Sequence, residues 1–107
     1  MIVWVLKQSN VEEGDEPLTF RMSAGHVRTV GRATRADFIL DAPLVSRLHC
    51  RLTAGAAELE VVDLESTNGT FVNGERIERA VLKTGDRLGV GRVELAITRG
   101  TAEPADS

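Results

Sequence analysis

The 107-residue sequence has one cysteine, no tyrosine and no long apolar run. A lone cysteine excludes an intrachain disulfide, so a reducing compartment is the default and we predict a cytoplasmic protein. No apolar stretch approaches the roughly 20 residues of a membrane helix. The short apolar start at 1–6 lacks the basic leader and cleavage site of a signal peptide. We therefore expect no membrane insertion.

Excess positive charge is also missing, since 13 Lys and Arg face 16 Asp and Glu, for a net charge of -3. A general nucleic-acid binder needs many cations to neutralise phosphates, so this class is disfavoured. Two histidines and one cysteine are too scattered for a zinc site. We expect no metal and no cofactor. His49 and Cys50 are successive strand residues that point to opposite faces, so they cannot form a nucleophile and base. We expect no enzyme activity.

Short apolar runs separated by turn residues fill most of the chain. With 42% hydrophobic residues, the length suits one domain with a real core. No segment has a sustained helical stripe, so the pattern predicts an all-β sandwich or barrel of ten or eleven strands. Asn73-Gly74 predicts a hairpin turn. We place the domain at 1–99 and a polar flexible tail or linker at 100–107. The expected strands are 2–7, 18–22, 27–31, 38–40, 48–53, 58–64, 70–72, 75–77, 87–90 and 93–98.

Three loops between these strands carry groups that suit a phosphate. Arg32 presents a planar fork of donors that matches phosphate oxygens, and Gly31 before it lets a backbone approach closely. Ser46 offers a hydroxyl and Arg47 adds charge. The segment 65–70 is a turn dense in hydroxyl and amide groups. Together the loops predict a site for a phosphorylated ligand.

These blocks occur in the order found in forkhead-associated (FHA) domains, and the sequence resembles that family over most of its length. A Ser-x-x-His block and a long Asn- and Gly-containing stretch are the most distinctive parts. Any single block is weak, and their shared order carries the resemblance. The matching segments are 31–32, 37–41, 45–49, 62–74, 85–86 and 91.

The resemblance implies an FHA-like β-sandwich of about eleven mostly antiparallel strands, with the binding loops at one end. It implies that these loops grip a phosphothreonine in an extended peptide. By this analogy Arg32 and Ser46 contact the phosphate, Thr67 adds a third contact, and Arg47 adds charge at the rim. Asn68 would hydrogen-bond the peptide backbone.

Other residues are expected to support the loops without touching the ligand. His49 is carried over from the family as a brace between them. The remaining structural positions are Gly31, Gly69, Asn73 and Gly74. Leu44, two residues before Ser46, implies an apolar preference at the third residue after the phosphothreonine.

The leading hypothesis is a phosphothreonine-dependent docking module in Ser/Thr kinase signalling. Its partner would be a phosphothreonine-containing protein, with a Ser/Thr kinase or its substrate as candidates, and we expect a monomer. The alternative keeps the fold and drops the phosphate: the domain would bind a partner, or itself, through a sheet face or an edge strand.

Overall fold

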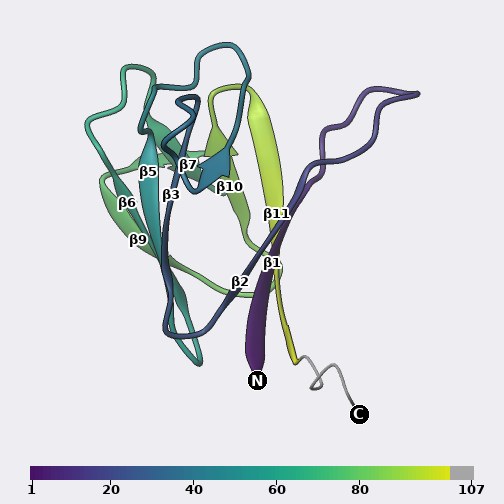
Figure 1. Cartoon of the computed structure of the whole chain (residues 1–107), viewed down its shortest axis with the longest axis vertical. Helices are drawn as coiled ribbons and strands as arrows, with labels where there is room; N and C mark the ends of the chain where they lie inside the picture. Colours follow the sequence, from purple (N-terminus) through teal and green to yellow (C-terminus); the bar gives the residue numbers. More distant parts are fainter. Residues whose placement is uncertain (102–107) are drawn as a thin grey trace.

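A computed structural model describes residues 1–101 of the chain, and every regular element in that range is a β-strand. The strands form two sheets packed face to face (Figure 1). The six-stranded sheet has the order β2 (Thr19–Ser23), β1 (Ile2–Gln8), β11 (Val93–Thr101), β10 (Arg87–Val90), β7 (Thr70–Val72) and β8 (Glu75–Ile77). The five-stranded sheet has the order β4 (Phe38–Ile39), β3 (Val27–Gly31), β5 (Cys50–Ala54), β6 (Leu59–Asp63) and β9 (Arg79–Leu82).

The predicted β-sandwich is therefore confirmed, and among these strands only β3 and β4 pair in parallel. The strand pattern in the sequence was also compatible with a barrel, but the strands divide into two separate sheets. Within residues 1–101 no helix has the length and apolar character needed to cross a membrane.

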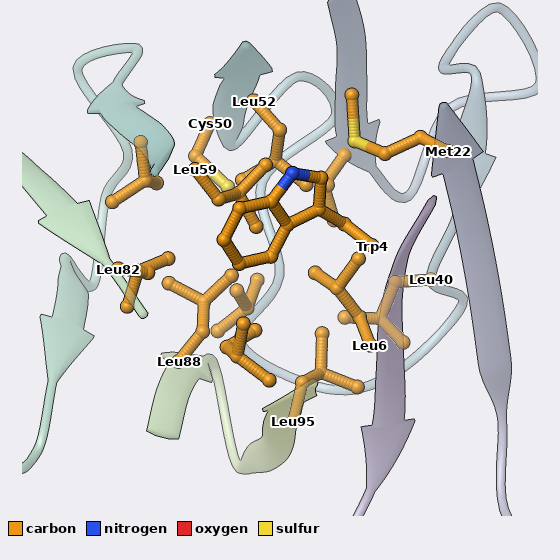
Figure 2. Close-up of a cluster of buried hydrophobic side chains, with 14 of the residues drawn as sticks. Trp4, Leu6, Met22, Leu40, Cys50, Leu52, Leu59, Leu82, Leu88 and Leu95 are labelled. Atoms are coloured by element: carbon orange, nitrogen blue, oxygen red, sulfur yellow. The ribbon is translucent and has the colours of Figure 1, made fainter. Parts of the chain in front are cut away.

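The core lies between the two sheets and is built by the alternation of buried and exposed residues along each strand. Trp4 and Leu6 of β1 point inward and are fully buried, facing Leu52 and Leu59 of the other sheet (Figure 2). Burying one such side chain stabilises the fold by about 1.5–3 kcal/mol. The indole nitrogen of Trp4 donates to the carbonyl of Gly55 at 2.8 Å, so its polar atom is satisfied. This core fixes the strands from which the loops leave.

The sequence prediction missed one strand, β9. It follows β8 after a single residue, Glu78, with no glycine, proline or asparagine to mark a break. Strand β8 belongs to the six-stranded sheet and β9 to the five-stranded one, so the chain changes sheets at Glu78. A crossover of this kind leaves no turn signal, which explains why the strand was overlooked.

Strand β11 continues to Thr101, where it pairs with Ile2 of β1. The ladder therefore includes two residues, Gly100 and Thr101, that the sequence had assigned to the tail. Main-chain pairing with a neighbouring strand requires no apolar side chain, so composition does not reveal it. The rest of that predicted tail, 102–107, lies outside the described residues.

Candidate functional site

The loops that follow β3, β4 and β6 gather at one end of the sandwich, away from the N-terminal end of β1 (Figure 1). They surround an open groove of about 870 Å³. We call it the groove throughout. It brings together all five residues predicted to contact a phosphopeptide: Arg32, Ser46, Arg47, Thr67 and Asn68.

Main-chain hydrogen bonds join the loop after β3 to the loop after β4. The amide of Arg32 donates to the carbonyl of Ser46 at 3.0 Å, and that of Ala33 donates to Arg47 at 3.1 Å. Gly31 allows this approach, because a Cβ there would lie 2.0 Å from the carbonyl oxygen of Arg47. The two loops are thus held in a fixed register at the groove.

The two arginines of the groove are exposed and keep most of their donors available. Arg32 uses its Nε to bond the carbonyl of Val45 at 3.1 Å, which orients the guanidinium without using its terminal nitrogens. Within residues 1–101 neither Arg32 nor Arg47 forms a salt bridge. An anion in the groove would meet two cations that form no ion pair within this range.

Ser46, Thr67 and Asn68 are set by hydrogen bonds between loops. The hydroxyl of Ser46 accepts from the amide of Thr67 at 3.0 Å, so its hydrogen can point to a ligand. Asn68 donates through Nδ2 to the carbonyl of Leu44 at 3.1 Å. That bond leaves the Asn68 side-chain oxygen as an acceptor for a peptide N–H.

His49 is fully buried beneath the groove and connects its loops. Its Nδ1 accepts from the amide of Ser46 at 3.0 Å. The other nitrogen, Nε2, lies 2.8 Å from the carbonyl of Gly69, which requires Nε2 to carry the proton in the neutral ring. The His49 main chain bonds Val30 and Leu64 as well, at 2.8 and 2.9 Å. One side chain therefore ties the Ser46 loop to the loop after β6.

A second, partly buried cluster shapes the loop after β6 and is centred on Asp63. Its Oδ1 accepts from the hydroxyls of Ser66 and Thr70 at 2.5 and 2.6 Å. The Ser66 hydroxyl in turn accepts from the amide of Gly69 at 3.0 Å. The turn that presents Thr67 is thereby folded around one carboxylate.

Burial acts to raise the pKa of Asp63, but the hydrogen bonds from Ser66 and Thr70 outweigh it and hold that pKa below its usual value. The carboxylate is therefore ionised in the folded protein. No role for Asp63 was predicted from the sequence. The only available signal was its spacing to Ser66, because Asp often bonds an amide a few residues ahead in a turn.

Two non-glycine residues on the groove rim adopt left-handed backbone conformations. Leu44 has a φ of 70° and Glu65 a φ of 55°, and both are exposed. Such conformations cost on the order of 1 kcal/mol each. In the same turn as Glu65, Gly69 has a φ of 92°, which suits glycine. The rim is thus held in shape by the anchors below it.

The predicted support residues Asn73 and Gly74 do not reach the groove. They form the turn between β7 and β8, with φ values of 51° and 85°, as expected for the predicted type I′ hairpin. Asn73 also exchanges hydrogen bonds with the main chain of Arg87 at 2.9 Å. Their contribution is to the six-stranded sheet.

Cys50 is buried, and desolvation with the nearby Asp63 charge raises its pKa to about 12. It is held as a neutral thiol, which is a poor nucleophile. Within residues 1–101 no group of three or more His, Cys, Asp or Glu side chains is placed to hold a metal ion.

These features define a β-sandwich interaction module whose groove is built from loops at one end. The chain belongs to the FHA domain family: the family model matches residues 28–91, a range that includes every residue lining the groove.

Known proteins that resemble the chain include a curated relative and two solved structures. The oxoglutarate dehydrogenase inhibitor of Corynebacterium glutamicum is 41% identical over 75 residues, which are 70% of this chain and 52% of that protein. An FHA structure from a study of phosphothreonine-dependent interactions has a TM-score of 0.76 and 27% identity, covering 97% of this chain and 99% of that one. Mycobacterium tuberculosis EmbR, in complex with a low-affinity phosphopeptide, has a TM-score of 0.77 and 25% identity, covering 96% of this chain and 26% of that one. The chain spans about half the length of most curated relatives it matches.

Proposed function

We propose that the chain binds phosphothreonine in partner proteins and thereby docks them in Ser/Thr kinase signalling, without catalysing a reaction. The observation that carries this proposal is the convergence of Arg32, Arg47 and the Ser46 hydroxyl on one groove. Both arginines are exposed there and form no salt bridge within residues 1–101. Donors held in this way suit an anion with several acceptor oxygens.

In the proposed complex Arg32 and Ser46 donate to the phosphate, and Thr67 adds a third contact. Arg47 contributes charge at the rim, and Asn68 bonds the peptide backbone. A phosphothreonine carries about -1.5 to -2 charges at neutral pH. Charge-assisted hydrogen bonds contribute roughly 1.5–3 kcal/mol each. A few of them account for a Kd near 1 μM, which corresponds to about -8 kcal/mol.

Similarity to FHA structures studied with phosphothreonine-dependent interactions or a bound phosphopeptide supports this ligand class. Relatives named as an inhibitor and as a regulator support a role in binding rather than catalysis. The raised pKa of buried Cys50 agrees with that role, since it removes the one thiol as a nucleophile. The monomeric state and cytoplasmic location stay predictions, and light scattering measures the first.

The test is calorimetric titration of a phosphothreonine peptide library, with unphosphorylated and phosphoserine versions, into the wild type and Arg32→Ala. We expect a loss of ~2–3 kcal/mol in Arg32→Ala, a drop of roughly 30- to 150-fold. Arg51→Ala is the matched control, because Arg51 is an exposed arginine on β5 outside the groove. Its affinity should equal that of the wild type.

Retained affinity in a folded Arg32→Ala variant would overturn the assignment. Partner capture from cell extract that is insensitive to phosphatase would favour the alternative, in which a sheet face or edge strand binds the partner.

A further inference from the structure

The groove carries side-chain charges of both signs. Arg32 and Arg47 share it with two carboxylates, Asp41 and Glu65. Within residues 1–101 none of these four side chains forms a salt bridge, since both ion pairs there join strand residues outside the groove. All four are exposed. The fold therefore leaves two cations and two anions available to a ligand.

The two carboxylates come from different loops, and neither contributes a hydrogen bond or an ion pair to the fold within the described residues. Asp41 lies in the loop after β4, and Glu65 lies in the loop after β6. Neither side chain forms a hydrogen bond within the described residues, unlike Asp63 of the same region, which organises a turn. Since both line one groove from different loops, we infer that their role concerns what enters the groove.

A phosphate alone fits this arrangement poorly, because carboxylates near a dianion repel it. A ligand that carries a cation beside the phosphate meets both signs of charge at once. We propose that Asp41 and Glu65 select phosphothreonine peptides in which a lysine or arginine lies within three residues of the phosphothreonine. This inference rests on the proposed phosphothreonine binding, and it names the partner class as basic phosphopeptides.

The length of an extended peptide sets the limit of three residues. Each residue advances the chain by about 3.3 Å, so three residues span about 10 Å. A lysine or arginine side chain adds several more ångströms of flexible reach. Because Asp41 and Glu65 line the same groove as Arg32 and Ser46, we expect a cation within this reach to contact one carboxylate while the phosphate stays with Arg32 and Ser46.

The expected signature is a pair of opposite effects. Each exposed ion pair should tighten binding about two- to fivefold, and both together about tenfold. Neutralising the carboxylates should therefore weaken binding of a lysine-flanked peptide. The same change should strengthen binding of an alanine-flanked peptide, because repulsion of the phosphate disappears. Damage to the loops would weaken both peptides alike.

The experiment measures Kd by fluorescence anisotropy for phosphothreonine peptides in an alanine background. One series carries a single lysine at each position from -3 to +3, a second carries glutamate there, and a third is the lysine series without phosphate. The proteins are the wild type, Asp41→Asn, Glu65→Gln and the double variant. Glu58→Gln is the matched control, since Glu58 is exposed in the turn at the opposite end of β5.

We expect the wild type to prefer the best single-lysine peptide over the alanine peptide by about two- to fivefold, the effect of one exposed ion pair. That ratio should fall to about one in the double variant and stay unchanged in Glu58→Gln. If the wild type binds alanine and lysine peptides equally, or the ratio persists in the double variant, the inference is overturned and phosphothreonine binding stands. If no phosphothreonine peptide binds, or phosphate makes no difference, the proposed function itself fails.

Discussion

Two loops of equal length show how differently this fold treats segments without regular structure. The loop between β4 and β5 covers residues 40–49, and the loop between β1 and β2 covers residues 9–18. The first buries Leu40, Val45 and His49 and forms one wall of the groove. The second is exposed throughout 12–18 and projects from the body of the sandwich (Figure 1).

The two loops differ in the hydrogen bonds that attach them to the rest of the protein. The 40–49 loop is bonded to two other loops: Ser46 accepts from Arg32 and Thr67, His49 bonds the carbonyl of Gly69, and Leu44 accepts from Asn68. The 9–18 loop is bonded to the body mainly at its base, where Asn10 exchanges hydrogen bonds with Arg92 and Glu94. Local stability follows buried contacts and protected hydrogen bonds rather than segment length. Only the anchored loop can hold charges at fixed positions for a ligand.

The largest expected effect comes from removing the main anchor. His49→Ala leaves the part-buried amide of Ser46 and the buried carbonyl of Gly69 without their partner and opens a cavity. Each orphaned group costs about 1–3 kcal/mol, so the free energy of unfolding should fall by roughly 3–5 kcal/mol. Urea denaturation measures it. Asn10→Ala in the other loop should lose no more than about 1 kcal/mol. Equal losses of stability in His49→Ala and Asn10→Ala would contradict the proposed difference between the two loops.

A smaller effect is expected from Gly31→Ala, which tests the contact between loops. The added Cβ would lie 2.0 Å from the Arg47 carbonyl oxygen, so one main chain must move. Overpacking of this kind costs about 1–3 kcal/mol. Gly14→Ala in the other loop is the control, because no atom lies within 4 Å of its Cβ position. Its φ of 93° still penalises alanine by itself, so we expect a loss of about 1–2 kcal/mol from backbone strain alone. A greater loss in Gly14→Ala would contradict this account.

The pH dependence of stability should reveal the contribution of the ionised Asp63 carboxylate. Because its folded pKa is lowered, its stabilisation is fully present above the unfolded value of 3.8 and is lost as pH falls through the folded pKa. Asp63→Asn should therefore lower stability by up to about 1 kcal/mol at pH 7, because solvent screens this partly exposed group, and flatten the loss of stability below pH 4. Thermal melts from pH 7 to pH 2 measure both changes. If the stability of Asp63→Asn fell as steeply below pH 4 as that of the wild type, this role of Asp63 would be contradicted.

The smallest effect is expected in the exposed loop. Replacing Glu12, Glu13, Asp15 and Glu16 by serine removes four exposed charges. Stability should change by less than about 0.5 kcal/mol. Phosphopeptide affinity at physiological salt should stay within about twofold, since exposed charges that form no direct ion pair with the ligand contribute little. Denaturation and anisotropy measure the two quantities. A larger change in affinity would mean that this loop reaches the ligand.

The sequence predicted those parts of the structure whose signals are local. Strands at 27–31, 70–72 and 75–77 have the bounds expected from their turn residues, and Asn73-Gly74 forms the expected hairpin. Strand β9 was missed because the change of sheet at Glu78 depends on the packing of both sheets.

The same distinction applies to the groove. The five predicted ligand residues line it, since their loops carry recognisable blocks. The bond from Arg32 to Val45 and the presence of Asp41 and Glu65 in one groove depend on how distant loops fold against one another. No spacing along the chain reveals them.

The hydrogen bonds that join the groove loops have a consequence for the timing of binding. Because Arg32, Ser46 and Asn68 are already bonded to neighbouring loops, a peptide need not wait for the site to assemble. Association should then proceed at similar rates for peptides of similar charge, set by diffusion and electrostatics. Differences among partners should appear in how long each complex survives. The module would thus sort its partners by residence time, releasing a poorly matched peptide soon after capture.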